Sequence, residues 1–437
     1  MFPSSLWYPH SALALSFHLL YEGSLHAQWR HYPHSSQVWF INSMRRRRMA
    51  AITMDPSLSR QVGKDSHQHG AVVEEIHGLI RVYKDGHVER PQIVPCVTSL
   101  LPSDLGVTCG DIVIHKLTNI WARFYVPAVR CHGKLPLLVY FHGGGFCVGS
   151  AAWSCYHDFL ARLAAKAGCL IMSVNYRLAP ENPLPAAYED GFKAFLWLKQ
   201  EAVSGASEWW SRACNFSSIF LAGDSAGGNI AHHLSLRLGS NRASEATALK
   251  PLVFKGTILI QPFFGGEART HSEKQMVSPS VLSLTASDTY WRLSLPYGAN
   301  RDHPWCNPMS KGSIKLLELR LLPTMVCISE MDILRDRNLE FCSALASAGK
   351  RVEHVVYKGV GHAFQILNKS PLAQTRTLEM LSHISSFITR WPLDPPTHHD
   401  CRWITNPYSM IKPRFVHTLP VCLVSGNINE YDFSVFS

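Results

Sequence analysis

The sequence Gly-Asp-Ser-Ala-Gly at residues 223–227 decides the expected fold because of what lies on either side of it. It is the single G-x-S-x-G in the chain, with an apolar strand pattern at 219–222 before it and a helical pattern at 229–238 after it. A sharp turn from a strand into a helix holds its central serine in a strained, accessible position, and the flanking glycines avoid side-chain collisions. The pattern indicates an α/β protein in which Ser225 is the candidate nucleophile.

Strand and helix patterns alternate through the middle of the chain, from about residue 70 to 391. A short apolar run that is typical of a strand buried on both faces lies at 135–141, and further strands are expected at 169–176, 255–260, 324–329 and 352–357. Apolar residues at helical spacing lie at 156–167, 188–202, 335–348 and 372–389. Hairpins are expected at 78–90 and 111–126, and a polar insertion at 265–308. This alternation predicts a mostly parallel sheet covered by helices.

A second glycine motif, His-Gly-Gly-Gly at 142–145, directly follows the strand expected at 135–141. Backbone N–H groups of such a run can approach the oxyanion of an acyl-transfer reaction, where each preorganised donor contributes roughly 10² to 10³ in rate. Gly143 and Gly144 are the candidate donors, and the N–H of Ala226 is the third. The run lacks the lysine of a P-loop and the spacing of a dinucleotide fingerprint, which argues against nucleotide binding.

A serine nucleophile needs a histidine base, which in this arrangement comes last in the chain order Ser, Asp, His. Six histidines follow the strand expected at 324–329. Only His362 follows the last expected strand, in the glycine-containing loop 359–362 at a carboxyl end of the sheet. His362 is therefore the candidate base.

The acid that orients this histidine is sought after the strand at 324–329. Asp332 is the first choice, because it follows that strand directly. Asp336 is the runner-up, although it lies in a helical pattern beside arginines, and Glu330 is a weaker third. Asp224 lies next to the nucleophile and is expected to support the local loops by hydrogen bonding rather than to orient the base.

Composition argues against several other classes of protein. The chain has 437 residues, 46% hydrophobic and 17% charged, which is enough apolar surface to form a sizeable core. No stretch reaches the roughly 18 apolar residues of a membrane helix. The net charge of +10 is partly concentrated in an arginine run at 45–48, and no nucleic-acid-binding signature is present. The 12 cysteines are scattered without a C-x-x-C, which indicates reduced thiols and no metal site.

The two ends differ from the middle. Residues 1–53 contain almost no acid and show no periodicity, and they are expected to form an unstructured N-terminal extension. A transit peptide is the alternative; without one, a cytoplasmic location is expected. Residues 392–437 follow a cluster of prolines and again lack periodicity, so they are expected to form a loosely attached C-terminal extension.

Several motifs together resemble the plant carboxylesterases of the hormone-sensitive-lipase-like branch of the α/β-hydrolases, to which the gibberellin receptors are related. They are HGGGF at 142–146, NYRLAPE at 175–181, GDSAGGN at 223–229, the segment of Asp332, and GHAF at 361–364. The resemblance covers about 70–391. It implies an eight-stranded α/β-hydrolase sheet with a cap formed by about 70–110 and 265–308. Gibberellin receptors have lost the histidine of the triad, whereas His362 is present here, so the resemblance implies a competent esterase.

The resulting prediction is a serine carboxylesterase without cofactor or metal, acting on a small-molecule ester. Ser225 is the nucleophile, His362 the base and Asp332 the acid that orients it. Short-to-medium acyl or aromatic esters are the expected substrate class. The alternative is a receptor that uses the same pocket to bind a hormone or another small molecule, and the intact triad argues against it. Neither nucleic acid nor an integral membrane segment is expected.

Overall fold

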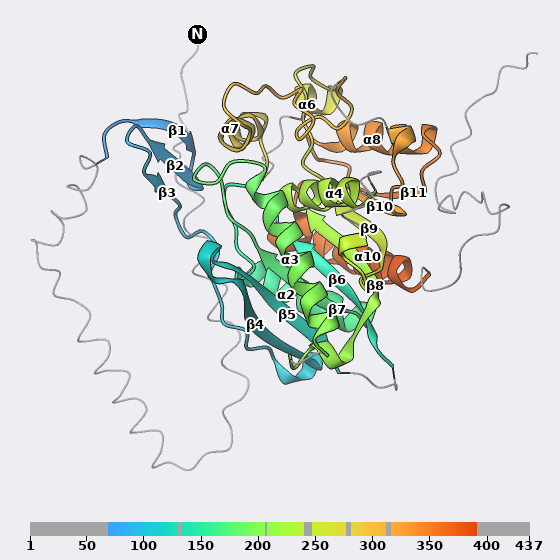
Figure 1. The fold of residues 1–437 in the computed structure, drawn as a ribbon. Helices are drawn as coiled ribbons and strands as arrows, with labels where there is room; N and C mark the ends of the chain where they lie inside the picture. The colour runs from blue at the N-terminus through green and yellow to red at the C-terminus, as the bar shows by residue number, and fades with distance from the viewer. Residues whose placement is uncertain are drawn as a thin grey trace, which may run out of the picture.

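The computed structural model describes residues 69–390, apart from 129–132, 206–207, 240–246, 277–280 and 312–315. The extensions expected at 1–53 and 392–437 lie outside the described residues. Within the described part, strands and helices alternate along the chain, and helices surround a central sheet (Figure 1). None of these helices combines the length and the apolar character that crossing a membrane requires.

The central sheet contains eight strands of the described chain and is mostly parallel, as predicted. In spatial order they are β11 (Val352–Tyr357), β10 (Thr324–Ser329), β9 (Phe254–Ile260), β8 (Cys214–Asp224), β6 (Leu135–Phe141), β7 (Leu170–Asn175), β5 (Ile120–Pro127) and β4 (Val107–His115). Neighbours from β11 to β7 pair in parallel, whereas β5 is antiparallel to both β7 and β4. The carboxyl ends of the parallel strands therefore meet at one edge, where sites of open α/β sheets collect.

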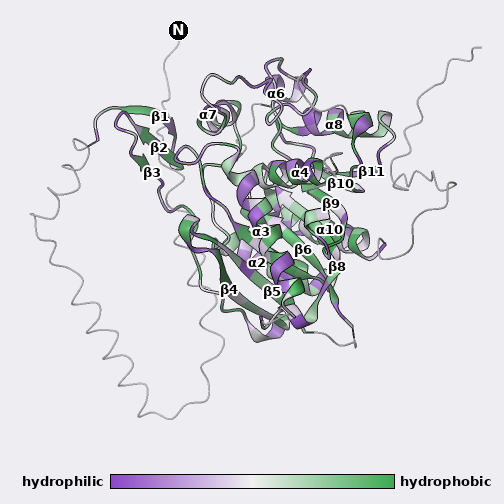
Figure 2. Ribbon diagram, in the orientation of Figure 1, coloured by the Kyte–Doolittle hydropathy of each residue, from purple (hydrophilic) through white to green (hydrophobic). Residues whose placement is uncertain are grey.

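Successive residues of the central strands point into two different hydrophobic cores, one on each face of the sheet. In β6, Leu137 and Val139 belong to the larger core, while Leu138 and Tyr140 belong to the other. A strand buried on both faces is apolar throughout, which explains the apolar run of the sequence and the hydrophobic colour of the central strands in Figure 2.

Helices cover both faces of the sheet. The larger core includes residues of α3 (Ala186–Val203), α4 (Ala226–Gly239), α7 (Leu284–Ser294) and α8 (Arg335–Ser347). The other core includes residues of α2 (Ser154–Ala167), α9 (Phe364–Leu367) and α10 (Pro371–Arg390). The remaining short helices are α6 (His271–Gln275), η3 (Ser103–Leu105), η4 (Lys116–Thr118), η5 (Ser211–Ala213) and η6 (Leu316–Glu318).

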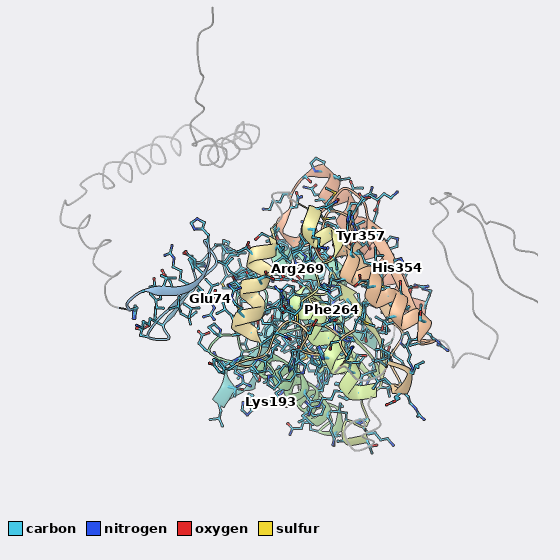
Figure 3. All side chains as sticks on the ribbon, turned by 90° about the horizontal axis from the view of Figure 1, so that it is seen from above. Glu74, Lys193, Phe264, Arg269, His354 and Tyr357 are labelled. Atoms are coloured by element: carbon cyan, nitrogen blue, oxygen red, sulfur yellow. The ribbon has the colours of Figure 1, made fainter. Side chains whose placement is uncertain are left out.

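A separate antiparallel sheet of three strands lies beside α7. Its strands are β1 (Val72–Ile76), β2 (Ile80–Tyr83) and β3 (Val88–Glu89). Arg292 of α7 donates two hydrogen bonds to the carboxylate of Glu74, at 2.8 and 2.9 Å. Figure 3, in which Glu74 is labelled, shows this small sheet next to α7 from above. The N-terminal segment and the insertion are thus joined directly.

The expected hairpins are confirmed as β2–β3 and β4–β5, although β4 begins at Val107, four residues before the expected 111, and strand β1 and the start of β8 were not predicted. Strand β1 pairs with β2 while its residues Val72 and Val73 are exposed, so it lies at the edge of the small sheet and contributes little to a core. Strand β8 begins at Cys214, five residues before the expected start at 219. Its residues 215–217 are half-buried or exposed, so no apolar run marks that part of the strand.

Candidate active site

Ser225 occupies the turn between β8, which ends at Asp224, and α4, which begins at Ala226. Its φ of 52° lies in the left-handed region, which is strained for a residue with a side chain. The Ser225 N–H donates to the Ile260 carbonyl at 2.8 Å, and its own carbonyl accepts from Phe263 N–H at 2.9 Å. These bonds fix the turn between the two neighbouring strand ends.

The glycines around this serine allow a close approach of backbone segments. A Cβ atom on Gly227 would lie 1.9 Å from the Phe141 carbonyl oxygen, and one on Gly223 would lie 2.3 Å from the backbone of Gly227. Both distances are far shorter than van der Waals contact. The two glycines of the G-x-S-x-G motif are therefore required by the packing of β8, α4 and the end of β6.

His362 lies between the other two residues predicted for the triad. Its Nε2 is 2.9 Å from Ser225 Oγ, and its Nδ1 is 2.7 Å from Asp332 Oδ2. All three side chains are buried. Because an ionised carboxylate can only accept hydrogen bonds, Nδ1 carries the proton, and Nε2 is left to accept from the Ser225 hydroxyl.

Two opposing effects set the pKa of His362. Burial lowers it, because desolvation disfavours the charged imidazolium. The charge and hydrogen bond of Asp332, with a further contribution from the charge of Asp224, outweigh burial. The net result is a pKa raised above the ordinary value of about 6.5.

The two alternative acids lie elsewhere. Asp336 accepts the Ser272 N–H at 2.6 Å and pairs with Arg335, so it links α8 to α6. Glu330 accepts the Gly359 N–H at 2.9 Å. Asp332 is thus the carboxylate that the geometry brings to the imidazole, and its second oxygen accepts the Leu334 N–H at 3.0 Å.

The geometry distinguishes between the backbone donors predicted for the oxyanion. The Gly143 N–H donates to Tyr156 Oη at 2.8 Å and to Asp224 Oδ1 at 3.1 Å, so it is already engaged, unlike the free donor expected from the sequence. Within the described residues, the Gly144 and Ala226 N–H groups have no acceptor. The φ of Gly144 is 109°, and a Cβ atom added there would lie 2.1 Å from Val148 O, so this position requires a glycine.

Comparisons with known proteins show the family to which this chain belongs. A family model described as alpha/beta hydrolase fold matches residues 138–366. "Probable carboxylesterase 6" of Arabidopsis thaliana is 58% identical over 329 residues, which cover 74% of this chain and 94% of the relative. The chain belongs to the carboxylesterases of the α/β-hydrolase fold. It is accordingly a carboxylic ester hydrolase, and the fold and enzyme class predicted from the sequence are confirmed.

Two further comparisons support this assignment of the esterase. "Tuliposide A-converting enzyme b2, amyloplastic" of Tulipa gesneriana is 34% identical over 72% of this chain and 79% of its own length. A solved esterase structure from Pyrobaculum calidifontis superposes with a TM-score of 0.54 at 28% identity, covering 65% of this chain and 86% of that chain. The part of this chain that superposes therefore has a fold that an esterase of another organism also has.

A buried cluster next to Ser225 was not identified as a unit from the sequence. Asp224 accepts hydrogen bonds from Tyr140 Oη at 2.7 Å and from Tyr156 Oη at 3.0 Å, in addition to the Gly143 N–H. Burial raises the pKa of Asp224 to about 6, although the bonds from the two tyrosines lower it in part. The expectation that Asp224 supports local loops agrees with these bonds. The tyrosines come from β6 and α2, and no spacing in the sequence relates them.

Aromatic side chains of the insertion pack against the glycine motif of the esterase. A Cβ atom on Gly145 would lie 2.3 Å from the ring of Tyr290 in α7. Tyr290 also lies near Phe263, with ring centroids 6.3 Å apart, and the Phe263 N–H donates to the Ser225 carbonyl. An aromatic side chain of α7 therefore lies against the glycine motif. Among the described residues, no group of three or more His, Cys, Asp or Glu side chains is arranged to hold a metal ion.

Proposed function

We propose that Ser225, His362 and Asp332 form the catalytic triad of this esterase and hydrolyse carboxylic esters through an acyl-enzyme. The observation that carries the proposal is the continuous hydrogen-bonded chain in which the His362 ring connects Ser225 Oγ at 2.9 Å with Asp332 Oδ2 at 2.7 Å. This is the geometry in which a histidine activates a serine and is itself oriented by a carboxylate.

In the first half-reaction, Ser225 Oγ attacks the ester carbonyl while His362 Nε2 removes its proton. The imidazolium that forms is stabilised by Asp332, which holds it through Nδ1. His362 then donates the proton to the leaving alkoxide, and the alcohol departs. In the second half-reaction, His362 takes a proton from the water that attacks the acyl-enzyme. His362 then returns that proton to Ser225 Oγ, the bond from Oγ to the acyl carbon breaks, and the carboxylic acid departs.

The negative oxygen of each tetrahedral intermediate needs donors that are not otherwise occupied. We assign this role to the N–H groups of Gly144 and Ala226, which have no acceptor within the described residues. The Ala226 N–H also lies at the positive end of α4, which favours negative charge nearby. Gly143 was expected to donate as well, but its N–H is held by Asp224 and Tyr156, so it serves to fix the loop.

The substrates we propose are uncharged small-molecule esters with a short-to-medium acyl chain or an aromatic group. The ring of Tyr290 packs against Gly145, next to the proposed donor Gly144, so an ester held by that donor would lie near an aromatic ring. Apolar and aromatic surroundings favour apolar ligands, because burying a charge without a partner is costly. We further propose that about 70–106 and 265–308 form the cap over the site, joined by the Glu74–Arg292 pair. Residues 107–110, which the sequence placed in the cap, belong to β4 of the central sheet.

A panel of nitrophenyl esters, from acetate to palmitate, tests this function. Purified protein should hydrolyse the acetate to octanoate members with kcat/KM falling steeply beyond about ten carbons, and His362→Val should reduce every rate by about 10³ or more. Equal rates for wild type and His362→Val would overturn the proposed triad. Tight ligand binding by a wild type that never turns over would instead favour a receptor role.

The cytoplasmic location expected from the sequence stays a prediction. The tulip relative is named amyloplastic. That name favours a test of the alternative, in which residues 1–53 contain a plastid transit peptide. Residues 1–53 are fused to the N-terminus of a fluorescent protein. The fusion should remain in the cytoplasm if these residues contain no targeting signal, and its import into plastids would refute a cytoplasmic location.

A further inference from the structure

A glutamine lies between the nucleophile turn and the histidine loop. Gln261 directly follows Ile260, the residue whose carbonyl accepts the Ser225 N–H. It is fully buried, and its φ of 47° lies in the left-handed region that residues with side chains rarely adopt. Its own N–H donates to the Cys327 carbonyl of β10 at 2.8 Å. The backbone of Gln261 is thus held between the end of β9, which bonds the turn at Ser225, and β10, which precedes Asp332.

The side chain of Gln261 reaches from these strand ends to the residue after His362. Its Oε1 accepts the Ala363 N–H at 2.8 Å, and its Nε2 donates to Ser329 Oγ at 2.7 Å and to Gln365 Oε1 at 3.3 Å. A backbone N–H can only donate, so the contact with Ala363 fixes which end of the amide is the oxygen. Every polar atom of the buried amide therefore has a partner.

The backbone at Ala363 depends on such a partner. Its φ of 55° is left-handed, and α9 begins immediately after it. Before His362 in the chain, two hydrogen bonds fix the loop. The Met331 N–H donates to the Val360 carbonyl at 3.0 Å, and the Gly359 N–H donates to the Glu330 carboxylate. Among the described residues, Gln261 makes the corresponding contact on the side that follows His362.

We propose that Gln261 is a positioning residue for the reaction: its Oε1 holds the Ala363 N–H and thereby sets the position of the His362 ring relative to Ser225. The inference rests on the proposed role of His362 as base. A neutral amide suits this role, because the charged groups that act on His362 are already Asp332 and Asp224. A carboxylate at 261 would add a third negative charge and favour the imidazolium, which cannot accept the serine proton.

Two substitutions distinguish the effect of the hydrogen bond that Gln261 accepts from the effect of the volume that its side chain fills. Gln261→Met keeps an unbranched side chain of similar length but removes the acceptor. We expect kcat to fall about 10- to 100-fold with KM nearly unchanged, since small misplacements of a catalytic group have effects of this size. Gln261→Glu keeps the acceptor. We expect its kcat at high pH to return to within about threefold of wild type, with the acidic limb of its pH profile moved to higher pH.

Ser329→Ala is the matched control, because it removes a partner of Nε2 and leaves the contact with Ala363. Its kcat should stay within about threefold of wild type. All variants are measured as full chains on nitrophenyl acetate, alongside thermal unfolding followed by circular dichroism. A purely structural role of Gln261 would lower Tm in Gln261→Met and leave kcat per folded molecule unchanged, and that result would overturn the proposal. So would a Gln261→Glu variant as impaired as Gln261→Met at every pH.

His362→Val, measured in parallel, keeps two failures apart. If His362→Val is inactive and Gln261→Met has the wild-type kcat, the positioning role is wrong and the triad stands. If His362→Val retains wild-type activity, the proposed function fails, and the positioning role fails with it.

Discussion

The carboxyl edge of the central sheet is held together by one kind of interaction, and the layer above it, which consists of α7 and the small sheet β1–β3, by another. At the sheet edge, buried backbone bonds join consecutive strand ends, as between Ser225 N–H and the Ile260 carbonyl. In the layer above, α7 is joined to the small sheet by the Glu74–Arg292 pair, whose side chains are 28% and 54% exposed. Exposed ion pairs contribute about 0 to 1 kcal/mol, whereas a buried polar group that loses its partner costs about 1 to 3 kcal/mol.

This difference separates two kinds of mutational effect. Changes at the sheet edge should act on the chemical step, because they move the proposed nucleophile, the proposed base or the proposed oxyanion donors. Changes in the layer above should act mainly on substrate binding, because that layer touches the glycine motif through Tyr290 and carries none of the triad. The predictions below, from largest effect to smallest, test this separation.

Removal of the nucleophile should have the largest effect. Ser225→Ala is expected to reduce kcat by about 10⁴ or more, because the three members of a triad act as a unit. The fold should be unchanged, since alanine keeps the Cβ and the backbone bonds of the turn. Steady-state hydrolysis and circular dichroism together test this. A variant that keeps a tenth of the wild-type kcat would disprove the assignment.

The two neighbouring aspartates provide a matched pair. Asp332→Asn should reduce kcat by about 10³ to 10⁴, because an amide that donates toward Nδ1 favours the wrong tautomer of His362. Asp336→Asn should reduce it less than fivefold, since Asp336 bonds Ser272 and Arg335 in the link between α6 and α8. The reverse order would transfer the role of acid to Asp336.

The raised pKa of His362 predicts the pH dependence. Only neutral imidazole accepts the serine proton, so kcat/KM should fall about tenfold for each pH unit below the pKa. Because Asp332 and Asp224 together favour the imidazolium more than burial disfavours it, the midpoint should lie above 6.5. A pH profile between 4.5 and 9 measures it. A midpoint below 6 would show that burial outweighs the two carboxylates.

The tyrosine that holds Gly143 should have an intermediate effect. Tyr156→Phe removes the hydroxyl that accepts the Gly143 N–H and donates to Asp224, so the loop that carries Gly144 loses one of its two anchors. We expect kcat to fall about tenfold with little change in KM, less than the loss of a donor itself. Tyr125→Phe is the control, because its hydroxyl contacts His157 instead. Equal effects of the two substitutions would argue against a role of the anchor in the chemical step.

The cap pair should have the smallest effect. Glu74→Gln weakens the link between β1 and α7, and we expect KM to rise about two- to threefold at unchanged kcat. Glu75→Gln is the matched control, because Glu75 pairs with Arg81 inside the small sheet. Steady-state kinetics on nitrophenyl butyrate distinguishes the two. A loss of kcat in Glu74→Gln would show that the layer above also acts on the chemical step.

The same contrast explains what could be predicted from the sequence. Strands β6, β10 and β11 were located within a residue or two, because β6 and β10 are mostly buried and largely apolar and the half-exposed edge strand β11 is rich in valine. Ser225, Asp332 and His362 each follow such a strand, and the structure brings them together as the order of motifs predicts. Short-range patterns are sufficient where backbone topology alone places a residue at the carboxyl edge of a sheet.

Long-range side-chain contacts left no comparable pattern. Tyr156 is 68 residues from Asp224, and Gln261 is 102 residues from Ala363, so neither contact has a periodicity that a single sequence reveals. The occupied N–H of Gly143 follows from the first of these contacts. For that reason the glycine motif could be recognised as a donor loop, whereas the donors within it could be distinguished only in three dimensions.

Covalent labelling of the serine tests the central claim most directly. Full-length wild type, Ser225→Ala and His362→Val are treated with a fluorophosphonate, and the modified peptide is identified by mass spectrometry. We predict one label per wild-type chain, on Ser225, none on Ser225→Ala, and labelling of His362→Val slowed by at least about 10², because its serine has no base. A label on another residue, or an equal labelling rate without His362, would contradict the proposed triad.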